Sequence, residues 1–192
     1  MKAKNNITGI ILAGGKSSRM RTEKGLILYK NKPFIKHIIE AMKPLVSNII
    51  IICNTRAYDR FGFNCYEDLI KNTGPLAGIY TGLNYSKTDN NLIVSCDIPL
   101  VNTVVLQKLI DQKNDASEVI QLQSQGKNMP LIALYKKSCE VIFKKELHQN
   151  QKKVQTALKK CNVKTVVIDE SLEQVTANIN TPEDLELLNF NL

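Results

Sequence analysis

Glycine, basic and hydroxyl residues gather in one short stretch near the N-terminus of the 192-residue chain. The apolar run Ile7–Leu12 leads directly into Gly14 and Gly15, and Arg19 and Lys24 follow in the same stretch. Adjacent glycines lack Cβ atoms and tolerate positive φ, so their backbone N–H groups can close around an anion. Arg19 adds a rigid fork of donors, and Lys24 adds a mobile point charge. The pattern predicts a buried strand followed by a loop that binds a polyphosphate.

Two better-known phosphate-binding patterns do not fit this loop. A P-loop ending at Gly15-Lys16-Ser17 would need its opening glycine at residue 10, which is Ile10. The dinucleotide pattern G-x-G-x-x-G also fails, because the stretch from Gly14 lacks the alternating glycines and the third one. A Gly-Gly pair alone would indicate an ordinary strand-to-helix turn, but Arg19 and Lys24 favour phosphate binding.

A carboxylate stands at the end of a second apolar run. Residues 92–96 are followed by Asp97, and Pro99 comes two residues later. Ligands of open parallel sheets gather at the carboxyl ends of strands. Mg²⁺ prefers one or two carboxylates together with substrate phosphate oxygens and water. Asp97 is therefore a candidate catalytic residue and Mg²⁺ ligand; the alternative is an N-cap for the helix expected over residues 101–113.

The hydrophobic periodicity predicts strands that alternate with helices. Strands are expected over residues 7–13, 49–53, 63–66, 92–96, 118–122, 131–135 and 163–168. Helices are expected over residues 34–46, 76–85, 101–113, 138–147, 154–160 and 182–189. This alternation predicts one α/β domain over residues 1–192, with a single doubly wound, mostly parallel sheet flanked by helices. A chain of this length needs no second domain.

The composition limits the class of protein. Hydrophobic residues make up 43% and charged residues 23% of the chain, as in ordinary globular proteins. The net charge of +8 comes from scattered lysines, which favours a nucleotide ligand over nucleic acid. No apolar run approaches the roughly 20 residues of a membrane helix, and residues 1–6 lack the apolar core of a signal peptide. We expect a cytoplasmic enzyme without a membrane or nucleic-acid partner, whose five cysteines are buried thiols.

The opening L-A-G-G-x-S-x-R-M, with Lys24 beyond it, resembles the signature of nucleotidyltransferases, and most closely that of the molybdenum cofactor guanylyltransferases. Further resemblance lies in G-P-L-A-G at Gly74–Gly78, in S-C-D-I-P around Asp97, and in N-x-N-T-P-E-D-L near the C-terminus. The chain departs from the family pattern R-M-G-x-D-K at Arg21 and Glu23, where Gly and Asp are usual. The resemblance implies a Rossmann-like nucleotidyltransferase fold.

The resemblance also implies two binding regions. On the nucleotide side it implies Leu12, Ala13, Gly14, Gly15, Lys24, Asn54, Asp68 and Asp97. On the pterin side it implies Gly74, Pro75, Gly78, Asn178 and Asn180. Without the resemblance, Asn54 and Asp68 would be ordinary turn formers. A carboxylate can accept hydrogen bonds from N1–H and the amine of guanine, and whether Asp68 or backbone groups read the base stays open.

The resemblance implies transfer of GMP from GTP to molybdopterin or molybdenum-molybdopterin, with release of pyrophosphate. Arg19, Lys24 and Asp97 would carry the catalysis, with Mg²⁺ as the cofactor on Asp97. Transient contacts with other cofactor-biosynthesis proteins are expected. One alternative is a cytidylyltransferase or a sugar-phosphate nucleotidyltransferase, which shares the same opening. Another is a non-catalytic nucleotide-binding protein, which the departures at Arg21 and Glu23 suggest.

Overall fold

Seven strands form one sheet in the computed structural model of the chain, which describes residues 6–14 and 23–190. The order across the sheet is β5-β4-β1-β6-β8-β7-β9. The bounds are β1 Ile7–Leu12, β4 Asn48–Ile52, β5 Asn64–Tyr66, β6 Asn90–Ser95, β7 Val119–Ser124, β8 Lys127–Lys136 and β9 Val163–Val167. Only β8 runs antiparallel to its neighbours in this described sheet, so the predicted mostly parallel sheet is confirmed.

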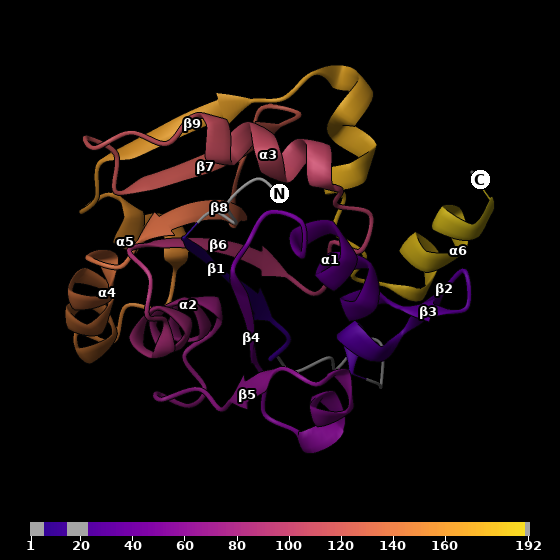
Figure 1. Ribbon diagram of the computed structural model, residues 1–192, viewed down its shortest axis with the longest axis horizontal. Coiled ribbons are helices and arrows are strands. Elements are labelled where there is room, and N and C mark those ends of the chain that lie inside the picture. The colour runs from indigo at the N-terminus through magenta and orange to yellow at the C-terminus, as the bar shows by residue number, and fades with distance from the viewer. Residues whose placement is uncertain (1–5, 15–22, 191–192) are drawn as a thin grey trace.

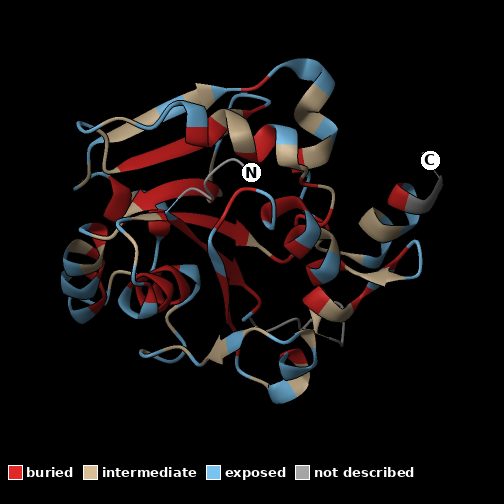
Figure 2. Ribbon diagram, in the orientation of Figure 1, coloured by how far each residue is buried: buried red, intermediate tan, exposed pale blue. Residues whose placement is uncertain are grey.

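Helices cover both faces of the sheet (Figure 1). One face carries α1 Phe34–Met42 and α3 Thr103–Asp111, and the other carries α2 Pro75–Tyr85, α4 Cys139–His148 and α5 Val154–Leu158. In β4, Ile49 and Ile51 join the core under α1 and α3, whereas Ile50 and Ile52 join the core under α2 and α4. Such a strand is buried on both faces, which explains why it is a continuous apolar run (Figure 2).

The parallel strands end level with one another. Leu12 of β1 pairs with Ile52 of β4 on one side and with Ser95 of β6 on the other. Backbone hydrogen bonds continue just beyond these pairs, from the Ala13 N–H to the Ile52 carbonyl and from the Cys96 N–H to the Leu12 carbonyl. The residues that follow β1, β4, β5 and β6 therefore emerge together at one side of the sheet, which we name the carboxyl edge.

Helix α2 packs unusually close to the sheet. A Cβ atom added to Gly82 would lie 2.5 Å from Cγ2 of Ile10, and one added to Gly78 would lie 3.3 Å from Cδ2 of Leu12. No larger residue fits at Gly82 without a shift of the helix or the strand. The two helix glycines therefore allow α2 to approach β1 closely.

Several predicted boundaries differ from the structure. Helix α1 ends at Met42 instead of residue 46, because Pro44 lacks a backbone N–H and restricts the residue before it. Between Ile27 and this helix lies an unpredicted hairpin of β2 Leu28–Tyr29 and β3 Lys32–Pro33. Its two turn residues both have positive φ, 47° at Lys30 and 60° at Asn31. A lysine in that conformation gives no clear sequence signal, which explains why the turn was missed.

The C-terminal helix α6, Pro182–Phe190, packs beside this hairpin (Figure 1). Ile179 and Leu188 form a buried cluster with Ile27, Tyr29 and Phe34. Short 3₁₀ helices connect the larger elements at η1 Lys24–Leu26, η2 Arg56–Phe61 and η3 Glu170–Thr176. None of the helices in the described part of the chain is long and apolar enough to cross a membrane.

Candidate active site

Lys24, Asp97 and Asn180 meet at the carboxyl edge. The Nζ atom of Lys24 donates a hydrogen bond of 2.6 Å to Oδ1 of Asn180 and lies 3.9 Å from Oδ2 of Asp97. The side chains of Lys24 and Asp97 are only 23% and 15% exposed. At this depth the attraction between the two charges is screened less than at an open surface. Three segments distant in sequence thus form one partly buried polar group.

The carboxylate of Asp97 is incompletely hydrogen-bonded within the described part of the chain. Its Oδ1 atom is buried and finds no hydrogen-bond partner among the described residues. A buried acceptor without a partner is costly, and it is explained when a ligand or ion supplies the missing interaction. The N-cap of α3 is Asn102, whose Oδ1 accepts a hydrogen bond of 3.0 Å from the Val105 N–H. The alternative prediction that Asp97 caps this helix is therefore wrong.

The donor set around Asp97 fits Mg²⁺ better than a cation that needs a protein cage. Among residues 6–14 and 23–190, no group of three His, Cys, Asp or Glu side chains is arranged to hold a metal ion. Mg²⁺ commonly binds through one or two carboxylates and completes its shell with substrate phosphate oxygens and water. The unpartnered Oδ1 of Asp97 is suited to such a contact.

A second group forms around Asp68. A Cβ atom added to Gly14 would lie 3.2 Å from Nδ2 of Asn54 and 3.7 Å from Oδ2 of Asp68. A Cβ atom added to Gly78 would lie 3.6 Å from Oδ1 of Asp68. Gly14, Asn54 and Asp68, which follow β1, β4 and β5, therefore lie close together. Gly14 leaves open the space that a side chain would otherwise fill.

Asp68 is a half-buried carboxylate with one buried oxygen. Its Oδ1 atom has no hydrogen-bond partner in the described part of the chain. Burial raises the pKa of Asp68 above its ordinary value, and a hydrogen bond from the Asn54 side chain acts in the opposite direction. The next residue is held in place because the Leu69 N–H donates to Oγ1 of the buried Thr81, 3.0 Å away. Thr81 was not predicted, although a hydroxyl inside an apolar helix was a signal that could have found it.

The residues implied for the pterin side come from two segments. Gly74 has a φ of 74° and lies with Pro75 at the exposed start of α2. Gly78 lies one turn further, where an added Cβ atom would meet Leu12 and Asp68, which the resemblance placed on the nucleotide side. Asn178 is exposed, whereas Asn180 contacts Lys24. Two of these residues therefore border both predicted binding regions.

The structure describes the phosphate loop only in part. Gly15, Arg19 and Arg21 lie outside the described residues. Glu23, one of the departures from the family pattern, accepts a hydrogen bond of 3.3 Å from the Tyr58 hydroxyl. Burial raises the pKa of Tyr58 well above its ordinary value, so this hydroxyl remains a donor.

Tyr58 also sets the approach of the segment that carries Lys24. A Cβ atom added to Gly25 would lie 2.8 Å from the Tyr58 hydroxyl oxygen, so a glycine is needed at this contact. Sequence reasoning missed Tyr58, because its position between Asn54 and Asp68 carries no motif of its own.

The C-terminal segment is tied to the site at several points. The Ile179 N–H donates a hydrogen bond of 2.7 Å to the backbone carbonyl of Asp97. Oδ2 of Asp184 accepts hydrogen bonds from the N–H groups of Asn180 at 2.8 Å and Thr181 at 2.9 Å. In return, the Asp184 N–H donates to Oγ1 of Thr181 at 3.2 Å, and the two residues form a capping box at the start of α6.

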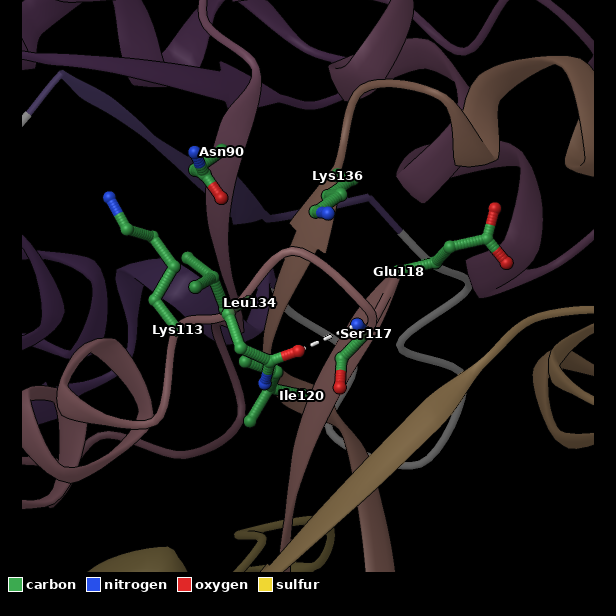
Figure 3. A pocket seen from close by; sticks show the side chains of 8 residues that line it. Asn90, Lys113, Ser117, Glu118, Ile120, Leu134 and Lys136 are labelled. Atoms are coloured by element: carbon green, nitrogen blue, oxygen red, sulfur yellow. Dashed lines mark hydrogen bonds between the residues drawn. The ribbon is translucent and has the colours of Figure 1, made fainter.

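A separate hollow lies at the opposite end of β6 (Figure 3). Asn90, the first residue of β6, lines it together with Lys113, Ser117, Glu118 and Lys136. Asp97 follows the other end of this strand. The hollow therefore contains none of the predicted site residues and is not part of the carboxyl edge.

The family model described as a MobA-like NTP transferase domain matches residues 9–166. The chain belongs to this family. A protein of Flavobacterium johnsoniae named probable molybdenum cofactor guanylyltransferase is 41% identical over 186 residues, which cover 97% of this chain and 98% of that protein. A molybdenum cofactor guanylyltransferase of Vibrio parahaemolyticus is 34% identical over 180 residues, which cover 92% of this chain and 91% of that protein.

Solved structures confirm the nucleotidyltransferase fold of this MobA-like chain. The molybdopterin-guanine dinucleotide biosynthesis protein A of Archaeoglobus fulgidus matches with a TM-score of 0.82 and 22% identity, over 96% of this chain and all of that one. The 4-diphosphocytidyl-2C-methyl-D-erythritol synthase of Anaerococcus prevotii matches with a TM-score of 0.77 and 13% identity, over 97% and 95% of the two chains. Because a cytidyl enzyme shares the fold, the fold alone does not select the base.

Proposed function

We propose that this chain transfers GMP from GTP to molybdopterin or molybdenum-molybdopterin and releases pyrophosphate. One observation carries the proposal: the carboxyl edge holds two carboxylates that each have one buried oxygen. Asp97 lies beside the lysine Lys24, and Asp68 lies beside a glycine and an amide. A nucleoside triphosphate needs two such environments, one for its phosphates and one for its base. The names of relatives at 34% and 41% identity support guanine as the base and the pterin as the acceptor.

In this reaction the terminal phosphate of the pterin attacks the α-phosphorus of GTP, and pyrophosphate leaves. Lys24 stabilises the triphosphate and then the departing pyrophosphate, because its ammonium follows the charge as it moves. Asn180 keeps that ammonium beside Asp97. Asp97 would hold Mg²⁺, which when bound neutralises phosphate charge and polarises phosphoryl oxygens. Arg19, outside the described residues, is proposed to contact the phosphates.

The proposed base site is the group around Asp68. An ionised carboxylate accepts the N1–H and the exocyclic amine of guanine, a pair of donors that adenine does not present together. Asn54 orients this carboxylate, and Gly14 leaves the base space to approach it. Leu12, Ala13 and Gly15 belong to the same proposed nucleotide side.

The proposed acceptor side consists of Gly74, Pro75, Gly78, Asn178 and Asn180. Transient contacts with other cofactor-biosynthesis proteins and a cytoplasmic location belong to the same proposal.

Pyrophosphate release with each of the four nucleoside triphosphates, with and without molybdopterin, tests the function. We expect release with GTP and only when molybdopterin is present. Release with CTP at an equal or higher rate would instead support a cytidylyltransferase. Tight GTP binding without release under any of these conditions would support the non-catalytic alternative.

A further inference from the structure

A carboxylate on the C-terminal helix is connected to the Lys24 ammonium through a single intervening residue. Asp184 lies in the first turn of α6 and binds the backbone N–H of Asn180. The side chain of the same asparagine accepts the hydrogen bond from Nζ of Lys24. We propose that Asp184 is a positioning residue, which fixes Asn180 so that Lys24 is held at the phosphates; this inference rests on the proposed function for the role of Lys24.

The geometry exceeds what a helix cap requires. In a capping box, the side chain at the third helical position binds only the N–H of the capping residue, here Thr181. Oδ2 of Asp184 also binds the N–H of Asn180, which precedes the cap. This additional bond fixes the backbone from which the Asn180 side chain projects toward Lys24.

The opposite side of the segment is fixed as well. The Ile179 N–H donates to the backbone carbonyl of Asp97, so the chain before Asn180 is anchored to the strand end that carries the candidate Mg²⁺ ligand. The side chain of Ile179 is buried in the cluster beneath the hairpin. Asn180 is thus held from both directions, and its amide oxygen has a defined position relative to Asp97.

An asparagine is chemically suited to this role. Lys24 has a long side chain with many rotamers, and a hydrogen bond restricts them. The amide oxygen of Asn180 is neutral, so it orients the ammonium without cancelling its charge, as a directly bonded carboxylate would. Asp184 fixes the backbone of Asn180 and acts on the Lys24 ammonium only through this asparagine. The ammonium therefore remains available to phosphate oxygens.

Chemical labelling of Lys24 tests the inference without GTP or acceptor. Wild type and Asp184→Ala would be acetylated with a soluble N-hydroxysuccinimide ester, and labelling of Lys24 relative to Lys108 would be followed by peptide mass spectrometry. We expect Lys24 to be labelled about fivefold faster in Asp184→Ala, as when one hydrogen bond of ordinary strength is lost. An unchanged relative rate would overturn the inference.

Thr181→Ala is the matched control. It removes the hydroxyl that accepts from the Asp184 N–H but keeps the carboxylate and both N–H groups that the carboxylate binds. We expect it to lower the melting temperature of the protein while the relative labelling of Lys24 stays at the wild-type rate. Equal acceleration in Thr181→Ala and Asp184→Ala would show a purely structural cap. If Asp184→Ala does not fold, Asp184→Asn, which keeps the shape of the side chain, replaces it, with about threefold faster labelling expected.

A double-mutant cycle on pyrophosphate release provides the second readout. We expect Asp184→Ala to lower kcat about tenfold while KM for GTP changes little, because the lost interaction acts in the transition state. In a Lys24→Ala background the same change should have no further effect. Multiplicative effects would overturn the inference. Faster labelling in Asp184→Ala without GTP turnover by wild type would refute the proposed function and leave the coupling of Asp184 to Lys24 standing.

Discussion

The carboxyl edge contains two partly buried carboxylates whose surroundings differ. Asp97 and Asp68 each have one oxygen without a hydrogen-bond partner among the described residues. Asp97 lies 3.9 Å from the Lys24 ammonium, whereas Asp68 is accompanied by the neutral amide of Asn54 and by two glycines, Gly14 and Gly78. The cationic surroundings suit phosphate and metal, and the neutral, open surroundings suit a flat base that offers N–H donors. The same residue type is thus suited to two ligand chemistries because of its neighbours.

The largest expected effect comes from Asp97→Asn, which keeps the shape of the side chain and removes its charge. We expect pyrophosphate release to fall roughly a hundredfold or more, because Mg²⁺ stabilisation of the phosphates is lost. Rates should be measured across Mg²⁺ concentrations, with the melting temperature as the control for folding. A folded variant that retains a rate within about threefold of wild type at saturating Mg²⁺ would remove the metal role from Asp97.

Asp68→Ala should act on base recognition instead. We expect GTP binding to weaken by about 1–3 kcal/mol, the cost of leaving buried donors of the base without their acceptor. Binding of CTP and ATP should change much less, which calorimetry with all three nucleotides in Mg²⁺ would show. An equal loss for all three would mean that Asp68 supports the site without reading the base.

Asn180→Ala tests whether the two carboxylate regions work separately. We expect turnover to slow about tenfold, the size expected for one lost hydrogen bond to a charged group, while GTP affinity is nearly unchanged. Turnover should be measured against both substrates, and GTP affinity by calorimetry. Comparable loss of GTP affinity and acceptor use would contradict the assignment of Asn180 to the pterin side. A collapse in melting temperature would point to a structural role in the capped helix start.

The smallest effect concerns stability and pH. Burial raises the pKa of Asp68 in the folded protein above its ordinary value of 3.8, so folding favours the protonated form. The stability contributed by the protonated form is complete below the unfolded pKa and is lost as the pH rises through the folded pKa. Asp68→Asn, which mimics the protonated form, should therefore raise the melting temperature at neutral pH. The gain in melting temperature should vanish below pH 3.8. A gain that stays constant from neutral pH to below pH 3.8 would contradict the burial argument.

Much of the site was predictable because its signals are local. Asp97 follows an apolar strand, and Lys24 follows a glycine loop; both are visible within a few residues of sequence. The capping box of Thr181 and Asp184 also lies within four consecutive residues, and the structure contains it. By contrast, the hairpin before α1 depends on positive φ at Lys30. Lysine is uncommon in this conformation, so its presence does not predict a left-handed turn.

The sequence by itself determined the order of the seven main-sheet strands and the α-helices between them, because periodicity and strand-end polar residues follow from local chain geometry. Only the tertiary structure decided which of these residues meet. Lys24 and Asn180 are 156 residues apart, and their hydrogen bond exists because the C-terminal segment returns to the carboxyl edge. The convergence of Gly14, Asn54 and Asp68 likewise depends on β1, β4 and β5 lying in parallel register. Such contacts arise from the packing of a whole sheet, which no short stretch of sequence encodes.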